Sequence, residues 1–325
     1  MVWPSVKNYH KQVSSVFKKP ELLVTPQQAE DIAPLAAAGA DAFLAGEQAF
    51  GLRLAGEFRK SDMEKAVQLA HQSGKKLYAA VNAIFHNNQL PTLKEYMHFL
   101  QQIGVDAVVF GDPAVLMTAK TEAIDIPLYW NTETTATNWG SVNYWGKNGA
   151  ERAVLARELN LDAITEIKEQ AGIDIEIQVH GMTCMFQSKR KLVGNYMEFQ
   201  GRNVQIERRD KERGLHLYDP ERDARYPVFE DKNGTHIMSP RDMCIIDELD
   251  DLLEAGIDAF KIEGILKDTA YLQGITALYK EAIEDYNKNA ALYNEKREDY
   301  ANRAQRLQPK GRQLDTGFFF KETVY

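Results

Sequence analysis

The sequence predicts an α/β fold: a closed (β/α)8 barrel of the TIM type, with an insertion after the seventh strand and a long C-terminal helix. Three observations support this prediction. Eight short apolar segments alternate with segments of helical periodicity, the pattern Gly-X-Asp-Ala-apolar recurs, and 325 residues with 44% apolar content suffice for a large core. Eight successive βα units favour a closed barrel over an open sheet.

The predicted strands are short apolar runs bounded by turn residues. In chain order they cover residues 21–26, 41–46, 76–82, 107–112, 127–133, 152–158, 175–181 and 259–264. The alanine-rich segment 27–39, between the first two, has the pattern of a helix that ends at a glycine. The Gly-X-Asp-Ala-apolar pattern occurs at 39–43, 104–108 and 256–260, where each copy would end a helix and begin a buried strand.

We expect one dominant domain with two appendages. Residues 1–20 would form a polar lead-in, residues 21–270 the barrel, and residues 271–325 a C-terminal helix and tail, with the helix at roughly 270–306. The segment 197–238 is rich in Gly, Arg and Asp and would interrupt the barrel after strand seven, with a hairpin around Asn233-Gly234.

Charge is unevenly distributed along the chain, whose formal net charge is −8. Residues 187–213 contain more basic than acidic side chains: Lys189, Arg190, Lys191, Arg202, Arg208, Arg209, Lys211 and Arg213 against Glu198, Glu207, Asp210 and Glu212. Lys189, Arg190, Lys191 and Arg202 are candidates for RNA phosphate contacts, and Tyr196 and Phe199 for stacking on exposed bases. The alternative is a solvated basic loop.

Cysteine usage and the N-terminal segment predict a cytoplasmic location. The chain has two cysteines, and its start, MVWPSVKNYHKQ, lacks the apolar core of a signal peptide. We expect no membrane contact, because no run of about eighteen apolar residues occurs.

Polar residues follow the predicted strands at the end that would form the barrel mouth, where enzymes of this fold place their active sites. The candidates for catalysis are His180, Glu263, Lys261, Asn82, Asp112, Arg157 and Glu158. Asn82 and Asp112 could instead form turns or cap helices, Arg157-Glu158 could be an internal ion pair, and His180 could be a hydrogen-bonded core histidine. Lys261 and Glu263 are two residues apart on a strand and would share a face.

Spacing alone predicts no metal site. Cys184 and Cys244 are 60 residues apart without a CxxC motif, which is more typical of buried free thiols than of zinc or iron–sulfur ligands. The sequence also contains no Gly-rich phosphate loop, no HExxH motif and no GxSxG motif.

Several motifs, in order, resemble the collagenase-like peptidase family U32. They are HGMTC at 180–184, GNY at 194–196, MSPRDMC at 238–244 and FKIEG at 260–264, with DAFLAGEQAFGLR at 41–53, VNAIFHN at 81–87, VFGDP at 109–113 and VLARELN at 154–160. The resemblance covers nearly the whole chain from Glu21 onwards.

The resemblance implies one of two activities. Some family members are called proteases, and others belong to oxygen-independent hydroxylation systems, which act on ubiquinone precursors or form 5-hydroxyuridine at the tRNA wobble position with prephenate as hydroxyl donor. The hydroxylating members hold an iron–sulfur cluster on four cysteines. Cys184 and Cys244 stand at two such positions, but Lys191 replaces another and no cysteine occurs around Gly201–Arg209, so we expect no cluster in this chain alone.

Two further departures are the sequence Asn131-Thr132-Glu133, where the family usually has Ser-Thr-Gln, and an end at TGFFFKETVY, about where longer relatives continue. The resemblance thus implies the short, cluster-free member of a pair that modifies tRNA, with prephenate as co-substrate and with tRNA and a longer paralogue as partners. The alternatives are a collagenase-like peptidase, for which no Ser/His/Asp constellation is visible, and a non-catalytic scaffold.

Overall fold

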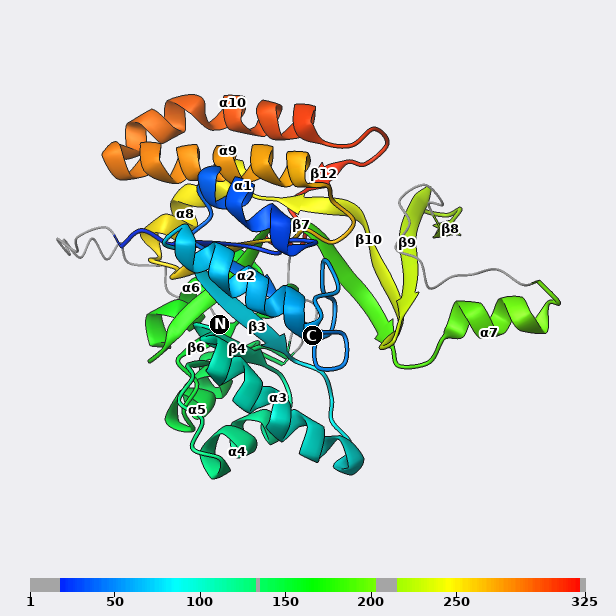
Figure 1. Cartoon of the computed structure of the whole chain (residues 1–325). Helices are drawn as coiled ribbons and strands as arrows, with labels where there is room; N and C mark the ends of the chain where they lie inside the picture. Colours follow the sequence, from blue (N-terminus) through cyan, green and yellow to red (C-terminus); the bar gives the residue numbers. More distant parts are fainter. Residues whose placement is uncertain (1–17, 133–134, 203–214, 322–325) are drawn as a thin grey trace, which may run out of the picture.

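The computed structural model describes residues 18–132, 135–202 and 215–321 (Figure 1). Its centre is a closed barrel of eight parallel strands. These are β1 (Glu21–Val24), β2 (Ala42–Ala45), β3 (Lys76–Val81), β4 (Ala107–Phe110), β5 (Leu128–Trp130), β6 (Arg152–Val154), β7 (Asp174–Ser188) and β11 (Ala259–Ile262). Because β11 pairs with both β7 and β1, the sheet closes on itself. The predicted fold class and all eight strand positions are confirmed.

Helices between the strands cover the outside of the barrel (Figure 1). They are η1 (Ala29–Asp31), α1 (Ile32–Ala37), α2 (Lys60–Gln72), η2 (Asn87–Gln89), α3 (Leu90–Ile103), α4 (Pro113–Thr121), α5 (Trp139–Lys147), α6 (Leu161–Gln170), η3 (Ile246–Glu248) and α8 (Leu249–Glu254). Alternate strand residues such as Leu22 and Val24 pack against these helices, whereas Leu23 packs inside the barrel. In the described ranges, no helix combines the length and the apolar content that crossing a membrane requires.

The Gly-X-Asp-Ala repeat has a structural cause. Each glycine follows the end of a helix with a positive φ, as at Gly104 with φ 77°, a conformation that side chains disfavour. Each aspartate then accepts a backbone N–H from a neighbouring strand. Asp41 accepts from Leu22, Asp106 from Leu77 and Asp258 from Ile175, at 3.2, 2.8 and 2.8 Å. The repeat therefore fixes the N-terminal ends of β1, β3 and β7, which form the lower end of the barrel, opposite the mouth.

Strand β7 continues beyond the barrel and forms an arm, which Figure 1 shows projecting to one side. The arm also contains α7 (Leu192–Phe199), β8 (His216–Asp219), β9 (Ala224–Asp231) and β10 (Gly234–Cys244). β10 runs antiparallel to β7, from Thr235 opposite Ser188 to Cys244 opposite His180. The described parts of the insertion predicted at 197–238, residues 197–202 and 215–238, lie within this arm, while 203–214 lie outside the described residues. The predicted hairpin at Asn233-Gly234 joins β9 to β10.

The C-terminal segment is helical, but the single helix predicted at roughly 270–306 is two helices, α9 (Thr269–Lys288) and α10 (Ala290–Leu307). Asn289 separates them with an extended backbone, φ −166° and ψ 119°, and its side chain accepts the N–H of Ala291. α10 therefore folds back along α9 (Figure 1), where Tyr300 donates to Asp285 at 2.7 Å. The chain then pairs β12 (Leu314–Asp315) with β10.

Candidate functional site

The barrel interior is filled in layers, because inward-facing residues of alternate strands lie at the same height. The strand register assigns Leu23, Tyr78, Tyr129 and Glu176 to one layer. Next towards the mouth come Leu44, Val109, Val154 and Lys261, and above them Thr25, Ala80, Asn131 and Gln178. Of these three layers, the middle one is mainly apolar and the one nearest the mouth is mainly polar.

A buried ion network closes the lower end of the barrel. Arg152 Nη1 lies 2.8 Å from Glu21 Oε1 and 3.4 Å from Glu176 Oε2. The guanidinium also stacks over the Tyr129 ring, 4.4 Å from its centroid. Burial opposes ionisation of Glu21, but Arg152 outweighs it and holds the pKa of Glu21 below its usual value. Burial raises the pKa of Glu176 despite the same arginine.

A second polar group lies higher in the barrel, around Lys261 and Glu263. Lys261 Nζ is 3.0 Å from Glu263 Oε2, and both residues are at least 95% buried. Thr25 Oγ1 donates to Glu263 Oε1 at 2.7 Å and accepts the N–H of Gly264 at 2.6 Å. The predicted shared face of Lys261 and Glu263 is confirmed, and both side chains lie inside the barrel.

Two amide side chains complete this polar interior. Gln178 Nε2 donates to the backbone oxygens of Gly181 and Met182, at 3.2 and 3.1 Å. Its own Oε1 and the Oδ1 of Asn131 are buried without a hydrogen-bond partner among the residues that the structure describes. A buried polar atom in this state is costly unless a ligand or water supplies the missing bond. Sequence reasoning missed both amides as candidates.

Asn82 and Asp112, at the exits of β3 and β4, hold loops. Asn82 Oδ1 accepts the N–H of Leu52 at 2.8 Å. Asp112 caps α4 by accepting from Ala114 at 2.9 Å and also accepts from Phe85 at 2.9 Å. Asp112 thus matches the helix-cap alternative that the sequence left open. Asn82 instead holds the loop after β2, through a contact 30 residues away in the chain. In the loop after β6, Arg157 is half-buried and Glu158 is exposed.

His180 does not face the barrel mouth. Lys261 pairs with Gln178 and Ile262 pairs with His180, so a bulge at Val179 shifts the alternation of β7. The imidazole lies beneath α9, with Nε2 2.7 Å from the Tyr271 hydroxyl and Nδ1 3.4 Å from the Tyr279 hydroxyl. Burial lowers the pKa of His180 to about 3. The prediction that His180 joins Asn82, Asp112 and Glu263 at the mouth is therefore wrong.

His180 belongs to a buried network that reaches the C-terminal tail. Tyr271 donates to Gln308 at 2.6 Å, and Gln308 donates to Asp242 of β10. Asp242 also pairs with Lys267 and with Arg312, whose Nε is 3.1 Å away. Burial opposes ionisation of Asp242, but these two cations outweigh it and lower its pKa to about 2. The network ties β7, β10, α9 and the segment after α10 together.

Loop 46–58, which follows β2, covers part of the mouth. Its Leu54 packs among the inner barrel residues, beside Leu44 and Ala80. The arm holds this loop in place: Asn233 Nδ2 donates to the backbone oxygens of Gln48 and Gly51, at 3.0 and 3.1 Å. Arg53 donates to Gln187 of β7 at 3.1 Å. The mouth is thus closed on the β2 and β3 side by a loop that the arm supports.

The basic segment begins directly beyond these contacts. Lys189, Arg190 and Lys191 are exposed between β7 and α7, and Arg202 is exposed after α7. No residue of α7 is buried, and Tyr196 and Phe199 are 59% and 85% exposed. The remaining predicted basic residues, at 208–213, lie outside the described residues. The described part of the segment therefore offers cations and aromatic rings to solvent beside the covering loop.

Helix α7 is nevertheless firmly attached, through the buried carboxylate of Glu230 on β9. Glu230 accepts the N–H groups of Val193 and Gly194, at 2.9 and 3.2 Å, and Thr235 Oγ1 accepts that of Leu192 at 2.8 Å. A Cβ at position 194 would lie 2.9 Å from Glu230 Oε2, so the glycine of the GNY motif allows this close approach.

The two cysteines lie in different environments. Cys184 is half-buried opposite Met238, whereas Cys244 is buried opposite His180, with Sγ 3.8 Å from the Tyr279 hydroxyl. Four residues of β7 separate the two register positions, a distance on the order of 13 Å. Burial raises the pKa of the Cys244 thiol to about 11. The chain's own thiols therefore do not fit a four-thiolate iron–sulfur cluster.

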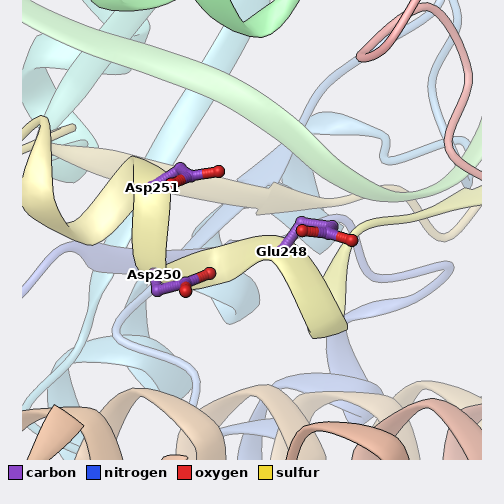
Figure 2. Close-up of side chains that lie close together, drawn as sticks. All are labelled: Glu248, Asp250 and Asp251. Atoms are coloured by element: carbon purple, nitrogen blue, oxygen red, sulfur yellow. The ribbon is translucent and has the colours of Figure 1, made fainter. Parts of the chain in front are cut away.

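An acidic group lies away from the mouth, at the start of α8. Figure 2 shows the carboxylates of Glu248, Asp250 and Asp251, which lie within 4.8 Å of one another. Within the described ranges, these are the side chains whose spacing could suit a cation. Arg297 of α10 pairs with Asp250, and acidic side chains are stabilised at helix N-termini, so the group has a structural explanation.

Comparison with known proteins gives consistent results. The model of peptidase family U32 matches residues 27–324. The tRNA hydroxylation protein P2 of Bacillus subtilis is 61% identical over 308 residues, which are 95% of this chain and 100% of that protein. The tRNA hydroxylation protein P1 of the same organism is 30% identical over 276 residues, 83% of this chain and 64% of that protein. The tRNA hydroxylation protein P of Escherichia coli is 31% identical over 309 residues, 82% and 68% of the two chains.

Proposed function

The chain belongs to peptidase family U32, and from this premise we propose that it is a component of a tRNA hydroxylation system. The observation that carries the proposal is the 61% identity to a protein named for tRNA hydroxylation, which extends over the full length of that relative. The more distant relatives P1 and P carry the same activity in their names.

The arm supports this proposal physically. Lys189, Arg190 and Lys191 offer positive charge for phosphates, while Tyr196 and Phe199 offer rings on which unpaired bases stack. Single-stranded RNA loops are recognised by this combination of cations and exposed aromatic side chains. In the proposed role, the arm holds the tRNA while a nucleotide reaches the barrel mouth.

The proposal extends to the reaction and to the partner. The product is 5-hydroxyuridine at the wobble position, prephenate is the hydroxyl donor, and a longer paralogue carries the iron–sulfur cluster. The existence of both a P1 and a P2 protein in one organism supports a pair of this kind. Since this chain's two thiols do not fit a cluster, its own contribution is to bind RNA and to complete the site.

The geometry favours neither alternative function. His180, the histidine nearest to Cys184 in sequence, is hydrogen-bonded to Tyr271 and Tyr279 and is fully buried. A peptidase would instead need a histidine within reach of a nucleophile and open to the substrate. A purely structural role would leave the unpaired amide oxygens of Gln178 and Asn131 in the barrel interior without a purpose.

The test is nucleoside analysis of tRNA from a strain that lacks this protein. We expect 5-hydroxyuridine to fall, to return when the wild-type gene is restored, and to stay low with Lys261→Met, which removes the inner cation. A parallel strain that lacks every paralogue gene as well serves as the positive control. If 5-hydroxyuridine stays at the wild-type level in the strain that lacks only this protein, the proposed function is contradicted.

A further inference from the structure

Three polar side chains lie on neighbouring parts of the inner barrel wall, and two of them carry a buried oxygen without a partner among the described residues. Lys261 lies opposite Gln178 in the strand register, and Asn131 occupies the same layer as Gln178 two strands away. Gln178 therefore lies between Lys261 and Asn131 around the barrel wall. All three are more than 90% buried. Lys261 has Glu263 as an ion partner, and an ammonium group can donate three hydrogen bonds.

The orientation of the central amide is fixed. Gln178 Nε2 faces the backbone oxygens of Gly181 and Met182, and exchanging its nitrogen and oxygen would bring three oxygens together. Gln178 Oε1 must therefore remain an acceptor, and it has no partner in the described part of the chain. Among the described residues, Asn131 has no such anchor for its amide, so it can present Nδ2 in place of the unpaired Oδ1.

We propose that Lys261, Gln178 and Asn131 recognise the Watson–Crick edge of the target uracil, an inference that rests on the proposed function. This edge presents an acceptor, the N3–H donor and a second acceptor. The three side chains present a donor on Lys261, an acceptor on Gln178 and a donor on Asn131, in matching order. Cytosine has an acceptor at N3, which would face Gln178 Oε1 and leave two lone pairs opposed. The site thus selects uracil over cytosine by its central contact.

Entry of a base requires the covering loop to move. Leu54 occupies the β2 and β3 side of the mouth, while Gln178 and Asn131 lie on the opposite side. Polar side chains attach the loop at three places: Asn233 bonds to two of its backbone oxygens, Gln187 accepts from Arg53, and Asn82 accepts from Leu52. Two of these three residues belong to the arm, so RNA bound on the arm is well placed to displace the loop.

The experiment measures binding of four anticodon stem-loop RNAs, which carry uridine, 5-methyluridine, 3-methyluridine or cytidine at the target position. The 3-methyl group blocks N3–H, whereas the 5-methyl group is a matched control for added bulk. We expect uridine and 5-methyluridine RNAs to bind alike, and the other two to bind about tenfold more weakly, since a buried acceptor stays unpaired. In Gln178→Met the four affinities should converge, whereas the exposed control Gln72→Met should retain the wild-type pattern.

Equal binding of all four RNAs to the wild-type protein would overturn the assignment, and so would failure to bind any of them. The comparison of the four RNAs uses only the wild-type protein. Misfolding of Gln178→Met, which thermal unfolding would detect, therefore does not affect it. The proposed function is judged separately by 5-hydroxyuridine in the deletion strain. Loss of that nucleoside together with equal binding would retain the function and reject only the uracil contacts.

Discussion

His180 shows how a single side chain can couple the stability of this protein to pH. Its ring is fully buried beneath α9 and hydrogen-bonded to the hydroxyls of Tyr271 and Tyr279. Protonation would place a charge in this buried region, which is why burial lowers the pKa to about 3 from the ordinary value of 6.5. The folded protein therefore holds His180 in the neutral form at physiological pH.

This shift predicts a specific pH dependence of stability. Between pH 6.5 and 3 the unfolded chain binds a proton at this histidine, whereas the folded chain does not. The contribution of neutral His180 to the stability of the folded protein is therefore complete above pH 6.5 and is lost as the pH falls. In His180→Gln the slope of unfolding free energy against pH should be smaller by up to about 1.4 kcal/mol per pH unit. Urea unfolding from pH 4 to 7 measures this slope, with the exposed His86→Gln as control. Equal slopes for wild type and His180→Gln would refute the explanation.

The site residues were only partly predictable from sequence. The two-residue spacing of Lys261 and Glu263 correctly predicted a shared inner face. The bulge at Val179 was not predictable, because it depends on the register with β11, a strand 80 residues later in the chain. Glu176 and Gln178 did leave a signal. Polar residues that alternate with apolar ones in a strand covered by helices must point into the barrel.

Among the elements, α7 is unusual because it is anchored at one end and exposed elsewhere. The backbone N–H groups at its start bind Glu230 and Thr235, while its own side chains make no buried contact. A carboxylate at a helix N-terminus is also favoured by the helix dipole. The arm thus presents Tyr196 and Phe199 from a fixed helix.

Glu230→Ala should release this helix without unfolding the barrel. Two part-buried hydrogen bonds to a charged group would be lost, which corresponds to roughly 1.5–3 kcal/mol each. We expect hydrogen exchange at Val193 and Gly194 to accelerate while strands β1 to β4 remain protected. Glu198→Ala, an exposed change on the same helix, is the matched control. Protection at Val193 that survives in Glu230→Ala would show that another contact holds α7.

The basic stretch before α7 carries the second prediction at this scale. Changing Lys189, Arg190 and Lys191 to Glu replaces attraction to phosphates by repulsion and should weaken tRNA binding strongly at low salt. The slope of log affinity against log salt should fall by about one for each lost contact. The fold should persist, because exposed charges contribute little to stability. Filter binding at several salt concentrations measures both quantities.

A control with the same change in net charge separates the local effect from a general one. The exposed residues Lys120, Lys147 and Lys310, changed together to Glu, serve this purpose. If both triple variants bind tRNA with the same affinity and salt slope, the segment 189–191 is an ordinary solvated loop.

The sequence predicts the existence of the helices and strands better than it predicts where they end. All eight barrel strands follow from short apolar runs between turn residues, because a strand buried on both faces leaves a continuous apolar pattern. The division at Asn289 was missed, since helical periodicity continues on both sides and one asparagine is a weak stop signal. Likewise, β7 was predicted to end at the barrel, but its pairing with β10 extends it to Ser188.

At the scale of the whole molecule, the barrel, arm and C-terminal helices are joined by buried charges. Asp242 of β10 bonds to Lys267 after β11 and to Gln308 and Arg312 after α10. This network fixes the base of the arm against the barrel. Cys244, two residues from Asp242, lies within this packed region, whereas Cys184 lies further along the arm.

The distribution of thiols leads to the final prediction, on metal content. The chain has two cysteines in separate environments, and an iron–sulfur cluster needs four protein ligands. Purified without oxygen, the isolated protein should therefore contain far less than four irons per chain, whereas its complex with the longer paralogue should contain a full cluster.

The double variant Cys184→Ser with Cys244→Ser should leave the iron content of that complex unchanged, because the paralogue supplies the ligands. Iron and sulfide analysis of both samples decides the matter. If the double variant loses iron from the complex, this chain contributes ligands to a shared cluster, and the proposed division of labour is incorrect.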